Sequence, residues 1–132
     1  MKKSDSAEKL LTEVELELMT IIWGIGQGSV ADVIARLPKG RDLAYTSVST
    51  ILRILEQKGT LKSRKEGRGH VYIPLLKKAE YEKRAIKHVV DHVIQGSPVD
   101  LVKRLLGSHT LKESEIQEIR ALLKEKGLHE NS

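Results

Sequence analysis

One short segment of this sequence concentrates polar and positively charged side chains at helical spacing. Five polar residues between positions 45 and 58 recur three or four positions apart, so a helix would bring them to one face. They are Thr46, Ser49, Thr50, Arg53 and Gln57. Hydroxyl, amide and guanidinium groups suit hydrogen bonds to phosphates and to base edges in the major groove of DNA. We therefore predict a DNA-facing helix surface; a polar face that meets only solvent is the alternative.

Four basic side chains follow, around a glycine-containing turn. They are Arg64, Lys65, Arg68 and His70. The segment from Arg53 to His70 holds six Lys or Arg residues and two acidic ones, a charge of +4, whereas the whole chain carries +5. A local concentration of positive charge attracts a polyanion. The pattern favours DNA as the partner of this segment, with an ordinary solvated hairpin as the alternative.

The sequence offers little for covalent or redox chemistry. It contains no cysteine, which excludes disulfides, thiolate metal sites and cysteine nucleophiles. It shows no nucleophile elbow, phosphate-binding loop or cluster of paired carboxylates. Gly24, Gly26 and Gly28 do not follow a predicted strand, which argues against a dinucleotide site. We predict neither an enzyme nor a bound cofactor.

Two histidines have a spacing that could bind a metal. His88 and His92 lie four positions apart on a predicted helix, with Asp91 beside them. Such a pair could hold zinc if His109 or a second copy of the chain supplied a third ligand. Two exposed histidines on a polar face are the simpler interpretation, and we predict no metal site.

Helix signals near the N-terminus place these residues within a small domain. Thr12 and Glu15 match a capping box that begins a helix, and three glycines between positions 24 and 28 end it. Ser29 begins a second helix, which ends at Pro38. Two short helices therefore precede the polar face described above.

The polar face itself belongs to a third helix, predicted over residues 45–58. Alternating side chains over residues 61–74, with a glycine-rich turn, then predict a β-hairpin. Three short helices followed by a basic hairpin are the element order of a winged helix-turn-helix domain. We place this domain at residues 10–75, after a disordered leader at residues 1–9.

The remainder of the sequence predicts three amphipathic helices. They cover about residues 77–95, Ser97-Pro98 to Gly107, and a last helix that begins at Thr110 or near Ser114 and ends at Gly127. Their apolar stripes are larger than three helices can bury alone, which favours self-association. We predict a helical dimerisation domain over residues 76–128 and a fold that is mostly α-helical with a small β-hairpin.

The sequence shows no signal for export or for insertion into a membrane. Residues 1–6 are polar and lack the apolar region of a secretory signal, and the apolar stretch over residues 16–25 is interrupted by polar residues. The lack of cysteine fits a reducing compartment. We expect a cytoplasmic protein.

Several segments, taken together, resemble one family of regulators. Residues 43–50 (LAYTSVST) and 52–59 (LRILEQKG) resemble the recognition helix of the penicillinase repressor family, which includes the methicillin-resistance and copper-transport repressors. Residues 11–19 (LTEVELELM), with Ile22-Trp23, are similar to the family's first helix. Residues 67–74 (GRGHVYIP) are similar to its wing. The resemblance extends in order along most of the chain.

This resemblance implies a sequence-specific transcriptional repressor that binds a dyad-symmetric operator as a homodimer. It implies DNA contacts from the recognition helix and from Arg68 at the wing tip, and a packing role for Trp23. The matching helix residues are Tyr45, Thr46, Ser47, Ser49, Thr50 and Arg53. A winged-helix scaffold for protein interactions and a histidine-based metal-responsive regulator are the alternatives.

Two departures from the family concern how the repressor would be released. The copper-responsive branch carries a C-terminal cysteine motif, which this chain lacks, so copper sensing by that route is excluded. The β-lactam branch is inactivated by a protease that cuts an Asn-Phe bond. The corresponding position here is Arg104-Leu105, and the chain contains no Phe. A protease is therefore a candidate partner without its familiar cleavage site.

Overall fold

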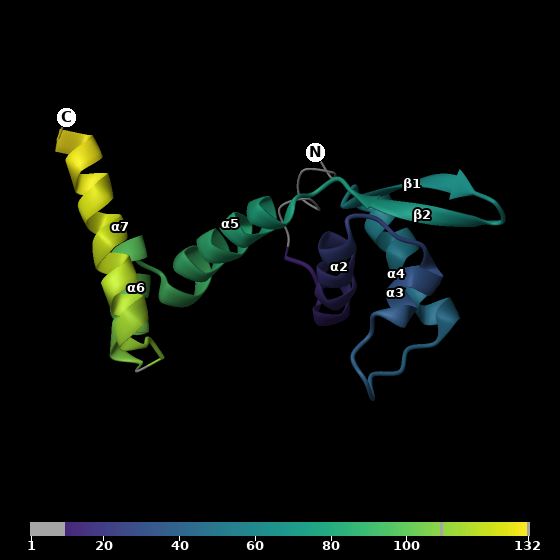
Figure 1. Ribbon diagram of the computed structural model, residues 1–132, viewed down its shortest axis with the longest axis horizontal. Helices are drawn as coiled ribbons and strands as arrows, with labels where there is room; N and C mark the ends of the chain where they lie inside the picture. Colours follow the sequence, from purple (N-terminus) through teal and green to yellow (C-terminus); the bar gives the residue numbers. More distant parts are fainter. Residues whose placement is uncertain (1–9, 109, 132) are drawn as a thin grey trace. The chain divides into compact units, whose positions relative to one another are not determined.

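The computed structural model describes residues 10–108 and 110–131, which form two compact units that meet between Ile86 and Lys87 (Figure 1). The elements of the N-terminal unit are α2 (Glu13–Ile25), α3 (Val30–Ala35), α4 (Tyr45–Gln57), β1 (Leu61–Glu66), β2 (Gly69–Pro74) and most of α5 (Lys78–His88). The C-terminal unit contains the π-helical turn η1 (Val89–Ile94), α6 (Pro98–Gly107) and α7 (Glu113–Asn131). This mostly helical chain with one hairpin confirms the predicted fold class. The predicted leader and His109 lie outside the described residues.

Capping boxes begin the first two of these helices, as predicted. The Thr12 hydroxyl accepts a hydrogen bond from the Glu15 N–H at 3.2 Å, and the Glu15 carboxylate accepts one from the Thr12 N–H at 2.9 Å. Ser29 and Asp32 make the same two bonds at the start of α3. Each box satisfies N–H groups that have no partner within the helix. At its other end α2 stops at Gly26, whose φ of 89° suits glycine.

The core of the N-terminal unit lies between α2, α3, α4 and the hairpin. Fully or nearly fully buried apolar side chains form it: Leu18, Met19, Ile22, Val30, Val33, Val48, Leu52, Leu55, Leu61 and Tyr72. Trp23 is half-buried against this core, and its indole N–H donates to the Leu76 carbonyl at 2.9 Å. The predicted packing role of Trp23 is therefore confirmed.

The hairpin is antiparallel, with a register that decides which side chains share a face. Ser63 lies opposite Tyr72, and Lys65 lies opposite His70. Gly28, in the loop after α2, forms an additional antiparallel bridge with Tyr72. The tip turns at Gly67, whose φ of 60° lies in the left-handed region. The strands therefore stay attached to the helices near Tyr72 while the tip extends away from them (Figure 1).

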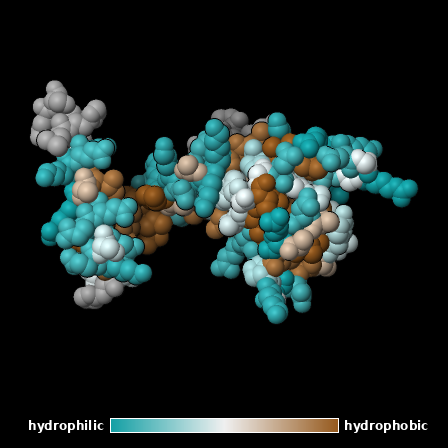
Figure 2. All heavy atoms as spheres, in the orientation of Figure 1, coloured by the Kyte–Doolittle hydropathy of each residue, from teal (hydrophilic) through white to brown (hydrophobic). Residues whose placement is uncertain are grey.

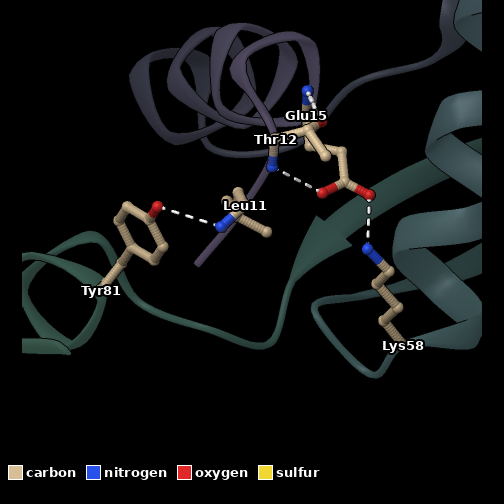
Figure 3. Close-up of polar contacts among 5 residues, drawn as sticks. All are labelled: Leu11, Thr12, Glu15, Lys58 and Tyr81. Atoms are coloured by element: carbon tan, nitrogen blue, oxygen red, sulfur yellow. Dashed lines mark hydrogen bonds and ion pairs between the residues drawn. The ribbon is translucent and has the colours of Figure 1, made fainter. Parts of the chain in front are cut away.

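A buried carboxylate connects the start of α2 to the end of α4 (Figure 3). Glu15 is 6% exposed, and its second oxygen accepts a hydrogen bond from the Lys58 Nζ at 2.7 Å. Burial alone would raise the pKa of Glu15, but the Lys58 ammonium and the Thr12 hydrogen bonds outweigh it and lower that pKa. The ionised carboxylate thus serves as both helix cap and ion-pair partner.

The first turns of α5 pack onto the N-terminal unit. Tyr81 is buried, and its hydroxyl accepts a hydrogen bond from the Leu11 N–H at 3.1 Å (Figure 3). Its ring packs at a tilt against Trp23, with ring centroids 5.9 Å apart. These contacts explain why the compact units meet within α5, whereas the sequence-based boundary lies before that helix, between residues 75 and 76.

The C-terminal unit departs from the sequence-based expectations at three points. The helix predicted to run to residue 95 ends in the π-helical turn η1, and Gln95 adopts a left-handed φ of 57°. Of the two predicted starts of the last helix, the one near Ser114 agrees to within one residue and the one at Thr110 is wrong, because α7 begins at Glu113 with the Glu115 carboxylate accepting from the Lys112 N–H at 2.8 Å. Its predicted end is also wrong, since α7 continues through Gly127. A single glycine costs a helix only about 1 kcal/mol.

The beginning of α6 agrees with the prediction. Ser97 is the N-cap and Pro98 the first helical residue, and the Asp100 carboxylate accepts from the Ser97 N–H at 3.0 Å. In the part of the chain that the structure describes, no helix combines the length and apolar character needed to cross a membrane.

The ionised Glu15 carboxylate yields a prediction for stability. Glu15→Gln should lower the free energy of unfolding of the N-terminal unit by about 1–3 kcal/mol at pH 7. Because the folded pKa is lowered, this stabilisation is present above the ordinary glutamate pKa and is lost as pH falls through the folded value. Urea unfolding followed by fluorescence of Trp23, the single tryptophan, measures it.

Glu17→Gln is the matched control, since the Glu17 side chain is more exposed at 25%. Its loss should stay below about 1 kcal/mol. Equal losses for the two variants, or a Glu15→Gln deficit that persists unchanged at pH 3, would contradict this account.

Candidate nucleic-acid interface

Helix α4 presents most of the predicted polar residues to solvent. Tyr45, Thr46, Ser47, Thr50 and Arg53 are exposed, and Ser49 is half-buried. Val48, Leu52 and Leu55 are fully buried and fix the rotation of the helix about its axis. The outward face is therefore set by core packing and is ready to meet a ligand surface without rearrangement.

The N-terminus of α4 lacks a side-chain cap. Ala44 is the N-cap and its methyl side chain accepts no hydrogen bond, in contrast to the capping boxes of α2 and α3. First-turn N–H groups without a capping side chain can donate to water or to an oxygen of a bound phosphate. Tyr45, the next residue, is 59% exposed beside these groups.

The turn between α3 and α4 is fixed by an arginine that the sequence analysis did not single out. Arg41 donates from Nε to one Glu17 oxygen at 2.9 Å and from Nη2 to the other at 3.0 Å. The hydrogen bonds from Arg41 lower the pKa of Glu17, and the carboxylate raises the pKa of Arg41. This two-point contact holds the turn against α2 and so steadies the entry into α4.

The four basic hairpin residues are all exposed, but they do not share one face. Lys65 and His70 are directly opposed and project on the side that also carries Ser63 and Tyr72. Tyr72 belongs to the core that includes α4, so this side of the hairpin faces α4. Arg68 occupies the turn between the strands.

Arg64 lies on the opposite side of the hairpin. Its guanidinium donates to the Gln27 side-chain oxygen at 3.4 Å and to Glu66 at 3.1 Å. The sequence analysis grouped it with the other three basic residues. The structure instead brings Lys65 and His70 together and directs Arg64 toward the loop after α2.

A hydrogen bond between side chains joins α4 to the hairpin. The Ser63 hydroxyl donates to a Glu56 carboxylate oxygen at 2.6 Å. Burial raises the pKa of the Tyr72 hydroxyl, and the nearby charge of Glu56 raises it further. Glu56 lies three residues after Arg53, on the same side of α4, and the sequence analysis did not single it out.

The two candidate metal-binding histidines lie in the C-terminal part of α5 and in η1. The His88 and His92 rings stack with centroids 4.4 Å apart, and Nδ1 of His92 lies 3.2 Å from the carbonyl oxygen of His88. Within residues 10–108 and 110–131, no cluster of three or more His, Asp or Glu side chains could hold a metal ion. The proposed third ligand His109 lies outside the described residues.

The geometry therefore combines a rigid polar helix face with a basic hairpin beside it. A comparison with known protein families decides the class. The sequence profile described as "Penicillinase repressor" matches residues 11–125, most of the chain and both compact units. The chain belongs to the penicillinase repressor family. Membership confirms the resemblance seen in the sequence and identifies the chain as a DNA-binding transcriptional repressor.

Individual relatives are distant but match along nearly the whole chain. The chain is 29% identical to the penicillinase repressor of Bacillus licheniformis, over 87% of this chain and 90% of that one. It is 25% identical to the methicillin resistance regulatory protein MecI of Mammaliicoccus sciuri, over 88% and 94% of the two chains.

One solved structure of a related protein aligns with about half of the chain. The solution structure of monomeric B. licheniformis BlaI in complex with the blaP half-operator aligns with a TM-score of 0.47 and 33% identity. The alignment covers 55% of this chain and 89% of that one.

The two faces of the hairpin yield a prediction for DNA binding. Lys65→Ala should reduce the slope of log affinity against log salt by about 0.9 per bound protomer, the amount expected for one lost phosphate contact. Arg64→Ala should change the slope less, because Arg64 lies on the other face beside Glu66. Fluorescence anisotropy with a duplex that carries a binding site selected from random DNA measures both slopes. A larger loss for Arg64→Ala would show that the opposite face meets DNA.

Proposed function

We propose that two copies of this chain bind one dyad-symmetric operator and repress transcription by occupying a promoter. The observation that carries the proposal is the exposed polar face of α4, held opposite a fully buried stripe in a member of a repressor family. The half-operator in the BlaI complex is consistent with one winged domain on each half of such a site. We place its action in the cytoplasm, where it meets chromosomal DNA.

In this proposal α4 lies in the major groove. Its contact residues are Tyr45, Thr46, Ser47, Ser49, Thr50 and Arg53. The small hydroxyl residues near the N-terminal end allow the helix backbone to approach the base edges, and the Arg53 guanidinium reaches a guanine or a phosphate one turn later. The open N-terminus of α4 adds donors for a phosphate oxygen.

The hairpin contacts the DNA backbone beside the groove. Lys65, Arg68 and His70 are its principal contacts, since they occupy the α4 side and the tip. Arg64 contributes as a weaker, more distant charge. Binding through these residues is salt-dependent because each neutralised phosphate releases counterions.

Self-association is supported by the apolar surface of the C-terminal unit (Figure 2). Its exposed large apolar side chains are Val93, Val99, Val102, Leu105, Leu106, Leu122 and Leu123. Helix α6 contains no buried residue, although its apolar side chains recur at helical spacing. A second copy that packs onto this surface would remove it from water and would hold two winged domains at a fixed separation. We accordingly assign dimerisation to the helices within residues 76–128.

Release from DNA would then follow from disruption of this unit. Arg104 and Leu105, at the position that resembles the family's cleavage site, are exposed on α6 among the apolar side chains. A protease that cut there would separate the winged domain from half of the proposed dimer surface. The chain's own inducing signal and protease remain part of this proposal.

The recognition helix is tested by removing its guanidinium. Arg53→Ala should weaken binding to an operator selected from random DNA by about fivefold to 150-fold, the effect of losing a base contact of about 1–3 kcal/mol. It should leave the urea midpoint unchanged, because Arg53 is exposed. Arg120→Ala, which removes an exposed arginine from α7, is the control and should bind normally. Unaltered binding by Arg53→Ala would refute the assignment of α4 as the recognition helix.

The dimer surface is tested by placing a charge on it. Leu105→Glu should shift the protein to monomer in sedimentation velocity and should reduce affinity for a full operator by at least about tenfold, since linkage of the two domains is lost. Leu75→Glu alters a similarly exposed leucine of the N-terminal unit (50% against 45%) and should remain dimeric. A dimeric Leu105→Glu, or a monomeric wild type, would exclude this interface.

A further inference from the structure

The hydrogen bond between Glu56 and Ser63 crosses from the recognition helix to the hairpin. Its oxygen atoms lie 2.6 Å apart, the short distance typical of a hydroxyl that donates to an ionised carboxylate. Such bonds are roughly twice as strong as those between neutral groups. Glu56 and Ser63 are both half-buried, so the bond is partly shielded from water. It is therefore suited to fixing one element against the other.

The position of Ser63 in the strand lets this bond influence the orientation of the hairpin tip. Ser63 and Lys65 are two residues apart on β1 and so point to the same face, about 7 Å apart along the strand. Lys65 is the direct partner of His70, and Arg68 follows in the turn between the strands. Any rotation of the hairpin about its attachment to the core would move these three side chains together.

At the level of Ser63 the hairpin is attached by buried apolar side chains and by the backbone bridge between Gly28 and Tyr72, whereas the tip beyond Ser63 has no buried residue. Leu61 and Tyr72 are buried in the core, whereas every residue of the hairpin from Arg64 to His70 is exposed. A two-stranded hairpin that packs against nothing is only marginally stable in water, so this tip gains little order from its own strand pairing. The Glu56–Ser63 hydrogen bond lies at the boundary between these two parts.

The charge of Glu56 is otherwise unfavourable on this surface. A carboxylate three residues from Arg53, on a helix that approaches phosphates, repels the ligand. An apolar or neutral side chain there would avoid that repulsion, so the carboxylate needs a compensating role. Its hydrogen bond to Ser63 provides one.

We propose that Glu56 and Ser63 are positioning residues that lock the hairpin at the angle at which Lys65 and Arg68 contact DNA phosphates. The inference rests on the proposed role of the hairpin in DNA binding. Neither residue needs to touch DNA. Loss of the bond removes phosphate contacts made by other residues, and this loss is visible in the salt dependence of binding, which a purely structural role would not change.

Ser63→Thr and Ser63→Val form a matched pair, because the two side chains have nearly the same shape and differ in the hydroxyl. Operator binding by anisotropy at several salt concentrations should give Ser63→Thr the wild-type slope. Ser63→Val should lose about 1–2 from the slope of log affinity against log salt per bound protomer, and about tenfold in affinity near 0.1 M salt. Urea unfolding followed by Trp23 fluorescence should show both variants fully folded under the binding conditions, with a lower midpoint for Ser63→Val because it lacks the hydrogen bond.

Glu56→Gln and Glu56→Met provide a second pair that does not alter the strand. Both remove the negative charge, but only glutamine retains an oxygen that can accept from Ser63. Glu56→Gln should keep the wild-type slope of log affinity against log salt, and Glu56→Met should have a smaller slope. Equal slopes within both pairs, or a loss of affinity at unchanged slope, would overturn the positioning role.

A double variant, Lys65→Ala with Arg68→Ala, separates this inference from the proposed function beneath it. If the double variant keeps the wild-type salt slope, the hairpin does not contact phosphates and the proposed function is wrong at that point. If the double variant loses slope, Ser63→Val added to it should cause no further loss. An additional loss of the same size in that background would show that Ser63 acts independently of the hairpin cations.

Discussion

Burial of one apolar stripe on α4 is the constraint on which the rest of the binding surface depends. Val48, Leu52 and Leu55 are completely excluded from solvent between α2, α3 and the hairpin. Helical periodicity sets the direction of each side chain around the helix axis. Once these three side chains point into the core, Thr50 and Arg53 must therefore point outward. The outward polar face of α4 is thus a consequence of core packing, and the helix already presents this face before any ligand binds.

Polar contacts outside the core then set the approach of the neighbouring elements to α4. The Glu15–Lys58 ion pair ties the end of α4 to the start of α2, and Arg41 ties the preceding turn to Glu17. The two ion pairs differ in how much they stabilise the fold. Glu15 is buried, whereas Arg41 is more than a third exposed and solvent screens its charge. The C-terminal unit shows the reverse balance, with large apolar side chains exposed and little buried core. The N-terminal unit buries its own core, whereas the C-terminal unit leaves large apolar side chains exposed. This division suits a DNA-binding domain that is joined to an assembly domain.

The parts of this structure that could be predicted from sequence are those governed by local rules. Capping boxes at Thr12 and Ser29, the stripe of α4 and the glycine turn of the hairpin each depend on residues within a few positions of one another. The contacts that could not be predicted join residues far apart in sequence, such as Glu15 with Lys58 and Arg41 with Glu17. Arg64 and Lys65 point to opposite faces because side chains alternate along a strand. The total charge of the segment does not distinguish the two faces, so it did not predict this separation. At Gly127 the local rule itself failed, because one glycine does not suffice to end a long helix.

Selection of binding sites from random duplex DNA, near physiological salt and read by sequencing, tests the central claim most directly. The account predicts enrichment of an inverted repeat whose half-sites are about one helical turn apart or slightly more, as two linked recognition helices require. A single unrepeated motif would contradict the dimeric arrangement. Weak binding without enrichment, lost steeply as salt rises, would contradict sequence-specific recognition by α4 and leave only non-specific attraction to phosphates.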